Sequence, residues 1–172
     1  TDSTIKGVLD NWYNSNLSGY ASKIATGEGA IFCNDRQPST DSSSMNGNGG
    51  AGMTKTYYAA KNRLEINRAP TFKCANTSDR FTTPVGLITA DEAVYAGNWA
   101  GNTGYYLYTG QVYWTLSPYH FSGDCAGVFG LNDGLGYINV DTYHGVRPVI
   151  NLKADTQFSS GNGTSSNPYI VA

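Results

Sequence analysis

The chain has 172 residues, of which 14% are charged, and a formal net charge of −2. It has no cluster of Lys and Arg and no apolar run near the roughly 18 residues of a membrane-spanning helix, so nucleic-acid binding and membrane insertion are not expected. The length suits one domain, 1–172, with its own core. Because the chain begins at Thr1 without Met or a signal peptide, we expect a mature or trimmed fragment.

The 13 Tyr and 21 Gly, together with many Ser, Thr and Asn, indicate an extracellular or cell-surface domain. Tyr provides a large contact area with few rotatable bonds, and small polar residues adapt to varied partners, as in antibody loops. This composition therefore favours a binding function.

The first predicted element is a helix. Apolar residues recur at spacings of mostly three and four, at Ile5, Val8, Leu9, Trp12, Leu17 and Tyr20. Ser3 or Thr4 is a suitable N-cap, and Gly19 lies near the expected end. We expect the apolar stripe to pack on a sheet, the alternative being a surface for a partner.

Two of the three cysteines, Cys33 and Cys74, lie in segments typical of ordered structure. They can form a disulfide, whose loop of about 40 residues would contribute roughly 3–4 kcal/mol in the chain-entropy model, or remain as two buried thiols. The third cysteine, Cys125, is outside this possible pair and is expected to be exposed.

The middle of the chain alternates loops with short ordered pieces. Residues 37–54 are rich in Ser, Asn and Gly and predict a long loop insertion. Residues 57–66 predict a short helical or extended piece, and 85–88 a buried strand-like step. Thr89 and Glu92 form a capping box, which predicts a second helix over 90–96 that ends at Gly97.

The stretch 111–152 contains the candidate binding face. Strand-like segments at 112–116 and 146–152 enclose 117–145, which is rich in Gly, Ser, Asn and aromatic residues and is expected to be loop-like. Residues 169–171 predict a last strand. The pattern predicts an α+β domain with two early helices, short and mainly antiparallel strands, and long loops.

Catalytic and metal sites are weighed against this binding function. His120, Asp124 and Cys125 are close in sequence, as a thiol nucleophile with a base and an acid would be, but we expect them to be unrelated surface residues. Oxygen ligands for calcium occur at Asn132, Asp133 and Asp141, without the spacing of an EF-hand. No zinc motif occurs, so we expect no cofactor, no metal and no catalytic residue.

Several segments together resemble a known group of proteins. They are Leu9–Tyr13, Phe32–Arg36, Gly86–Glu92, Tyr113–Pro118, Gly145–Ile150 and Asn162–Tyr169. The pattern resembles C-type-lectin-fold domains of the formylglycine-generating-enzyme-like kind, and in particular bacterial surface domains from gut Firmicutes and metagenomes. The resemblance implies a C-type-lectin-like fold. Formylglycine-generating enzymes use active-site cysteines and copper, and no matching cysteine pair occurs here, so enzymatic activity is not expected.

Some proteins of this fold are the variable proteins of diversity-generating retroelements, in which Asn codons change to a set that excludes Lys, Glu, Gln, Met and Trp. These five types make up about a tenth of the chain but are absent from 117–145. The resemblance implies a framework of Trp114, Arg147 and Pro148. It implies ligand-facing, diversified residues at Tyr119, His120, Phe121, Asp124, Cys125, Phe129, Asn132, Asp133, Tyr137, Asn139 and Asp141.

Arg147 is also notable without the resemblance. A charged residue inside a predicted strand must be paired or lie at an edge, so Arg147 either bonds to a carboxylate or carbonyl beneath the face or contacts a ligand.

The sequence thus predicts a non-enzymatic domain at the cell surface, outside the cell or on a phage. Its partner would be a protein or glycan on another cell or a phage. The alternatives are a structural module of a pilus or other surface assembly, and a thiol- or metal-dependent enzyme that uses Cys125 and His120.

Overall fold

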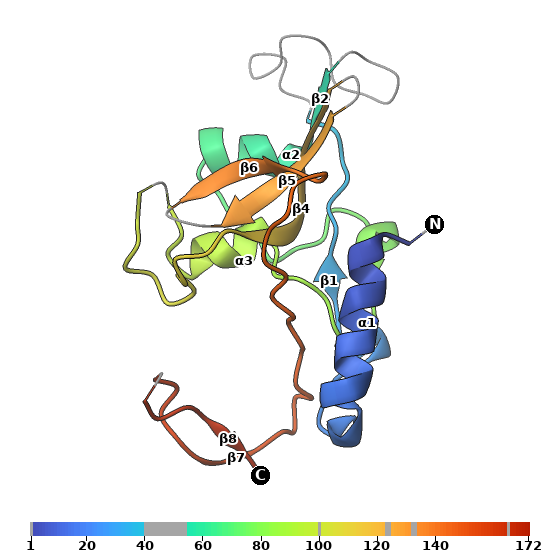
Figure 1. Ribbon diagram of the computed structural model, residues 1–172, viewed down its shortest axis with the longest axis vertical. Coiled ribbons are helices and arrows are strands. Elements are labelled where there is room, and N and C mark those ends of the chain that lie inside the picture. Colours follow the sequence, from blue (N-terminus) through green and yellow to red (C-terminus); the bar gives the residue numbers. More distant parts are fainter. Residues whose placement is uncertain (1, 40–54, 100, 123–124, 132–133, 165) are drawn as a thin grey trace. The chain divides into compact units, whose positions relative to one another are not determined.

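The computed structural model describes residues 2–39, 55–99, 101–122, 125–131, 134–164 and 166–172 (Figure 1). The fold is mixed α+β, with a few short helices and antiparallel sheets, as the sequence predicts. No helix in these ranges is long and apolar enough to cross a membrane. The described residues group into two compact units, and the single domain expected from the chain length stays a prediction.

The first unit contains residues 1–31, 82–85 and 150–172. Its helix α1, Thr4–Asn16, begins after Ser3, whose side chain accepts a hydrogen bond from the Lys6 amide. The helix ends before Gly19, and a short 3₁₀ turn, Ser18–Tyr20, follows. Its buried residues are Leu9 and Tyr13, whereas Val8 and Trp12 of the predicted stripe are exposed, so that stripe is only partly covered.

The rest of this unit is mostly irregular. A second 3₁₀ turn spans Gly27–Gly29, and Ile24 forms an antiparallel bridge with Leu152. Strand β7, Phe158–Ser160, pairs antiparallel with β8, Ile170–Val171. The predicted last strand is therefore confirmed in its final two residues.

The second unit, residues 32–81 and 86–149, contains two antiparallel sheets. Strands β1, Phe32–Cys33, and β3, Arg80–Phe81, form a two-stranded sheet, and a 3₁₀ turn, Thr77–Asp79, precedes β3. The larger sheet has the order β2-β4-β5-β6. Its strands are Lys55–Tyr57, Tyr113–Ser122, Cys125–Leu131 and Leu135–Asn139.

The larger sheet corrects the loop-like reading of 117–145. From Tyr113 to Tyr119 every second residue of β4 is buried, which is the period of a strand with one covered face. Pro118 is tolerated in this central strand because the register shifts on both sides of it, so bulges replace regular ladder hydrogen bonds.

Two helical segments pack on one face of this sheet (Figure 1). Helix α2, Ala59–Lys61, continues as a π-helical turn, Asn62–Ile66, so 57–66 is extended and then helical. Helix α3, Ala90–Tyr95, has the predicted capping box, in which Glu92 accepts from the Thr89 amide. The shared core consists of Ala60, Leu64, Ala90, Val94, Tyr119 and Phe129.

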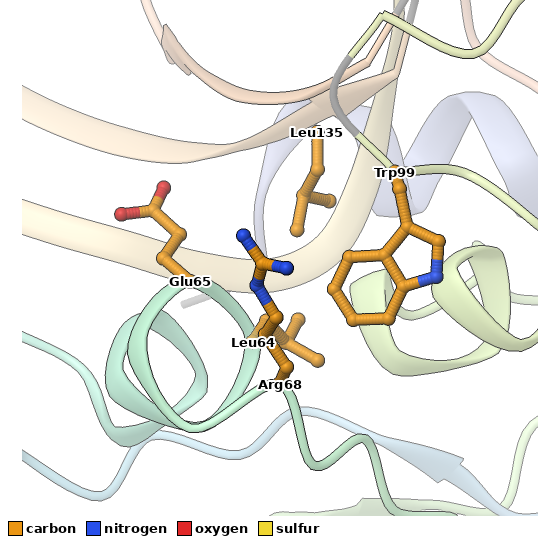
Figure 2. Close-up of a pocket in the computed structure, with 5 residues that line it drawn as sticks. All are labelled: Leu64, Glu65, Arg68, Trp99 and Leu135. Atoms are coloured by element: carbon orange, nitrogen blue, oxygen red, sulfur yellow. The ribbon is translucent and has the colours of Figure 1, made fainter.

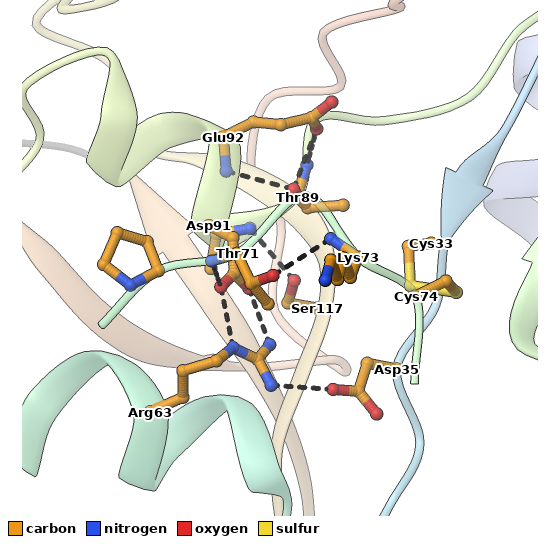
Figure 3. Close-up of polar contacts among 12 residues, drawn as sticks. Cys33, Asp35, Arg63, Thr71, Lys73, Cys74, Thr89, Asp91, Glu92 and Ser117 are labelled. Carbon is orange, nitrogen blue, oxygen red and sulfur yellow. Dashed lines mark hydrogen bonds and ion pairs between the residues drawn. A yellow bond between two sulfur atoms is a disulfide. The ribbon is translucent and has the colours of Figure 1, made fainter. Parts of the chain in front are cut away.

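A buried ion network joins three segments of this unit (Figure 3). The guanidinium of Arg63 donates two hydrogen bonds of 2.7 Å to the carboxylate of Asp91 and one of 2.9 Å to Asp35. Asp35 and Asp91 are 5% and 4% exposed, so both charges depend on this arginine. Burial lowers the pKa of Arg63, but the bonds and charges of Asp91 and then Asp35 outweigh it and raise that pKa.

The disulfide lies close to this network in the chain. The sequence left two cysteine states open, and the structure has the Cys33–Cys74 disulfide. Cys33 lies two residues before Asp35. The amide of Thr71, three residues before Cys74, donates to Asp91. The covalent link and the ion network therefore hold the same two loops against α3.

The ion network predicts an unequal response to losing two cations. Arg63→Ala is expected to lower the free energy of unfolding by about 3 kcal/mol or more, because it leaves two buried carboxylates unpaired. The control Lys6→Ala removes a partly exposed pair with Asp10 and should cost about 0.5 kcal/mol or less. Urea unfolding measures both, and equal losses would contradict the account of the network.

Candidate functional site

The structure places three of the predicted ligand-facing residues inside the protein. Phe129 is fully buried in the core, and Tyr119 and His120 are only 9% and 8% exposed. The prediction that these three face a ligand freely is wrong. Phe129 lies on the face of β5 that packs against the helices, and a bulge after Pro118 turns both Tyr119 and His120 to that same covered face.

Other predicted positions do reach the surface. Phe121, Cys125, Tyr137 and Asp141 are exposed, and Asn139 is half-buried. Asp124, Asn132 and Asp133 lie outside the described residues. The exposed positions do not form one continuous face, because Tyr137 is on the helix-covered side of the sheet and Phe121 follows the bulge.

The three residues that the resemblance implies as framework lie in the described part of the chain. Arg147 donates a 2.8 Å hydrogen bond to the Leu107 carbonyl. A bond to a carbonyl is one of the two outcomes expected for this charged residue, the other being a ligand contact. Its guanidinium also lies 5.4 Å from the centre of the Tyr113 ring. The half-buried Trp114 packs edge-on against His144, and Pro148 is half-buried. These positions are distinct from the pocket described below.

Two members of the expected catalytic trio, His120 and Cys125, lie in the described part of the chain, and the third, Asp124, lies outside it. His120 is buried opposite Gly127, whose lack of a side chain makes room for the imidazole, since a Cβ there would lie 2.9 Å from the ring. Cys125 is exposed and pairs in register with Ser122. Within the described residues, no group of three His, Cys, Asp or Glu side chains is placed to hold a metal ion.

Four rings form an aromatic cluster at the helix-covered side of the sheet: Tyr57, Tyr119, His120 and Tyr137. Tyr119 stacks on Tyr137 with ring centres 5.2 Å apart, and His120 contacts Tyr137 edge-on at 5.0 Å. Tyr57 meets the edge of Tyr119 at 5.9 Å. Tyr137 is 55% exposed, so it presents this cluster to solvent, whereas Tyr119 and His120 are buried and Tyr57 is half-buried.

Glu65 connects the aromatic cluster to the helix. Its Oε2 accepts a 3.2 Å hydrogen bond from the Tyr119 hydroxyl and lies 3.3 Å from the Lys61 ammonium. Burial, followed by the charge and hydrogen bond of Glu65, raises the pKa of Tyr119 above its usual value. Tyr119 therefore keeps its proton at neutral pH and donates the hydrogen bond that holds the Glu65 carboxylate in place.

A pocket of about 400 Å³ opens beside Glu65 (Figure 2). It is lined by Leu64, Glu65, Arg68, Trp99 and Leu135. Figure 2 shows the Arg68 side chain reaching from the end of the helical segment, with Glu65 on one flank and Trp99 on the other. Apolar walls with a few polar groups at this volume are typical of small-molecule sites.

Arg68 has an unusual backbone conformation. Its φ of +51° is the one positive value among the non-glycine residues that the structure describes. The Ala69 amide donates to the Arg63 carbonyl and so closes the helical segment, and this closure requires a left-handed residue, usually Gly or Asn. An arginine here costs on the order of 1 kcal/mol, which points to a use for its side chain.

The charges around the pocket are unequal. Glu65 is engaged by Lys61 and Tyr119, whereas Arg68 has no ion-pair partner among the described residues. Trp99 is 38% exposed and offers an indole ring to the same space. The pocket therefore combines one uncompensated cation, an aromatic wall and a floor of two leucines.

The sequence did not identify Arg68, Trp99 or Leu64 as site residues. Leu64 and Arg68 are four residues apart, a spacing that places them on one side of a helix, but Trp99 and Leu135 come from distant segments. The only local signal was an arginine where a helix is about to end, without the Gly or Asn that usually ends it.

The left-handed conformation predicts that Arg68→Gly raises stability. Removing the Cβ relieves the strain, so we expect the free energy of unfolding to rise by about 1 kcal/mol. The neighbouring control Asn67→Gly acts at a residue with φ of −81° and should lower it by a few tenths of a kcal/mol. Thermal or urea unfolding measures both, and a loss of stability in Arg68→Gly would show that the side chain supports the fold.

Comparisons with protein-family models, with curated proteins and with solved structures found no match. The resemblance carried by the sequence motifs therefore stays a prediction. The functional interpretation rests on the chemistry of the pocket and the aromatic cluster.

Proposed function

We propose that this protein is a non-enzymatic ligand-binding domain that acts at a cell surface, outside the cell or on a phage. Its partner is a protein or glycan carried by another cell or a phage. The observation that carries this proposal is the pocket beside Glu65, where Trp99 and Arg68 face an apolar floor of Leu64 and Leu135. Aromatic and arginine side chains in partly enclosed sites provide most of the affinity in known interfaces.

The scaffold around this pocket supports binding by a preformed site. Leu64 follows directly on Arg63 of the buried ion network, and Leu135 belongs to a strand that is paired along its length with β5. Lining groups that are already ordered lose little conformational entropy when a ligand binds. The disulfide Cys33–Cys74 suits an oxidising location outside the cytoplasm.

The finer fold and its diversification are part of the same proposal. A C-type-lectin-like arrangement is compatible with short helices packed on a small antiparallel sheet. If the segment 117–145 is diversified, substitutions are restricted to outward positions such as Tyr137 and Asp141, because Phe129 fills the core. Neighbouring DNA with a near-copy of codons 113–150 that differs at adenines, beside a reverse transcriptase gene, would support diversification.

A matched pair of tryptophans tests the binding function. Trp99 and Trp12 are 38% and 39% exposed, but only Trp99 lines the pocket. We expect Trp99→Ala to weaken the binding of pocket ligands by about 2 kcal/mol or more, and Trp12→Ala to leave it unchanged. The measurement is saturation-transfer NMR with a panel of monosaccharides, sugar acids, aromatic acids and short peptides.

The panel also shows how the proposal fails. Ligands that bind both variants equally would place the binding surface elsewhere. A panel in which no compound contacts the wild-type protein would contradict a small-ligand pocket.

One observation favours a second function, that of a structural module in a surface assembly. The hairpin of β7 and β8 exposes Phe158, Tyr169 and Ile170, each more than half exposed, with the rings of Phe158 and Tyr169 stacked. Exposed apolar groups of this kind are typical of contact surfaces between proteins.

The assembly function predicts self-association that depends on this hairpin. Phe158→Ser combined with Ile170→Ser should abolish oligomers seen by light scattering at high protein concentration. Removing the exposed Tyr106 instead should leave those oligomers unchanged. A wild-type protein that remains monomeric across the concentration range would count against the assembly function.

A further inference from the structure

We infer that the pocket of Leu64, Glu65, Arg68, Trp99 and Leu135 binds an organic anion in which a carboxylate is attached to a six-membered ring. This inference rests on the proposed function, which assigns a ligand to the pocket, and deepens it by giving the chemistry of that ligand. Three features of the pocket carry it: its charge, its apolar surfaces and the conformation of Arg68.

The charge of the pocket selects an anion. Lys61 and the Tyr119 hydroxyl both engage Oε2 of Glu65, so the negative charge of Glu65 is already compensated. Arg68 is exposed and has no such partner in the described part of the chain, so its positive charge is available to a ligand beside the apolar side chains of the pocket. A guanidinium binds a carboxylate through two parallel hydrogen bonds, so one carboxylate matches this single cation.

The apolar surfaces select a ring. Trp99 contributes a flat indole face and the half-buried Leu135 provides aliphatic surface to the volume of about 400 Å³, while the fully buried Leu64 closes it from the core side. A linear acid would cover little of this surface, whereas a six-membered ring can stack on the indole while its carboxylate reaches Arg68. Burying that ring face contributes on the order of 25 cal/mol per Å² of apolar area.

The conformation of Arg68 supports a role in recognition over a role in folding. Its left-handed backbone suits Gly or Asn better, and no ion pair among the described residues compensates for the strain. An arginine at such a position is most simply explained by the charge that it adds to the pocket.

Two kinds of compound carry this chemistry: a uronic-acid-type sugar and an aromatic acid. Glu65 discriminates between them. Because both of its contacts use Oε2, its Oε1 remains, within the described residues, an acceptor for a ligand hydroxyl. A sugar acid can donate hydroxyls to it, and a benzoate ring cannot, so the sugar acid is favoured.

The experiment is an NMR titration of the intact chain that follows its indole N–H signals. The chain has three tryptophans, and Trp99→Phe assigns the signal of interest. The probes are D-glucuronate, its neutral counterpart D-glucose, and benzoate. We expect glucuronate to shift the Trp99 signal saturably and glucose to have a much weaker effect. Arg68→Gln should weaken glucuronate binding by about tenfold or more, while Arg80→Gln, the same change at another exposed arginine, should not.

The outcomes separate this inference from the proposed function. Shifts with benzoate but not glucuronate would retain the ring-and-carboxylate chemistry and assign it to an aromatic acid. Equal binding of glucose and glucuronate, unaffected by Arg68→Gln, would overturn the inference and leave the binding pocket intact. No shift of Trp99 with any of the three probes would also overturn the inference, and the wider ligand panel would then decide the proposed function by itself.

Discussion

The pairing of Arg63 with Asp35 and Asp91 is the interaction on which the second unit depends. It brings together the segment after β1, the π-helical turn and the start of α3, which are separate parts of the chain. Two nearly buried carboxylates are acceptable there only because one planar guanidinium binds both of them. The position and rotation of the turn that carries Arg63 follow from this constraint.

The rotation of that turn determines what its neighbours do. Leu64 enters the core, and Glu65 accepts from Tyr119 at the edge of the aromatic cluster. The wide π-type turn, closed by the Asn67 amide on the Asn62 carbonyl, then leads to Arg68 in its left-handed conformation beside the pocket. A structural charge pair, a core residue and two pocket residues therefore follow from one local geometry.

Local signals in the sequence predicted local structure well. The capping box of Thr89 and Glu92 and the N-cap of Ser3 are specific hydrogen bonds between near neighbours, and both helices begin where expected. The α+β class followed from short strand-like segments between turns. The loop-like reading of 117–145 was wrong for the residues in β4, β5 and β6, because Gly and Ser were taken as loop residues, whereas Gly127 makes room for His120 within a strand.

The site could not be predicted to the same extent, because it depends on the face of the sheet to which each strand residue points and on contacts between distant segments. A bulge after Pro118 changes which side Tyr119 and His120 face, and although a proline inside a strand indicates an irregularity, it does not say which side chains the bulge turns. Arg68 and Trp99 are 31 positions apart and meet only through the packing of the helices on the sheet. The binding face expected over 117–145 stays a prediction, and the structure removes Phe129 from it because that side chain fills the core.

The central claim is that a rigid, charge-anchored scaffold holds a preformed pocket between Arg68 and Trp99. The most direct test is a pair of crystal structures, one without ligand and one soaked with D-glucuronate. The account predicts the same open pocket and the same left-handed Arg68 in both, with the carboxylate on the guanidinium and the sugar ring on the indole. A ligand-free structure in which Trp99 folds onto Leu64 and fills the space, with Arg68 in an ordinary helical conformation, would contradict it.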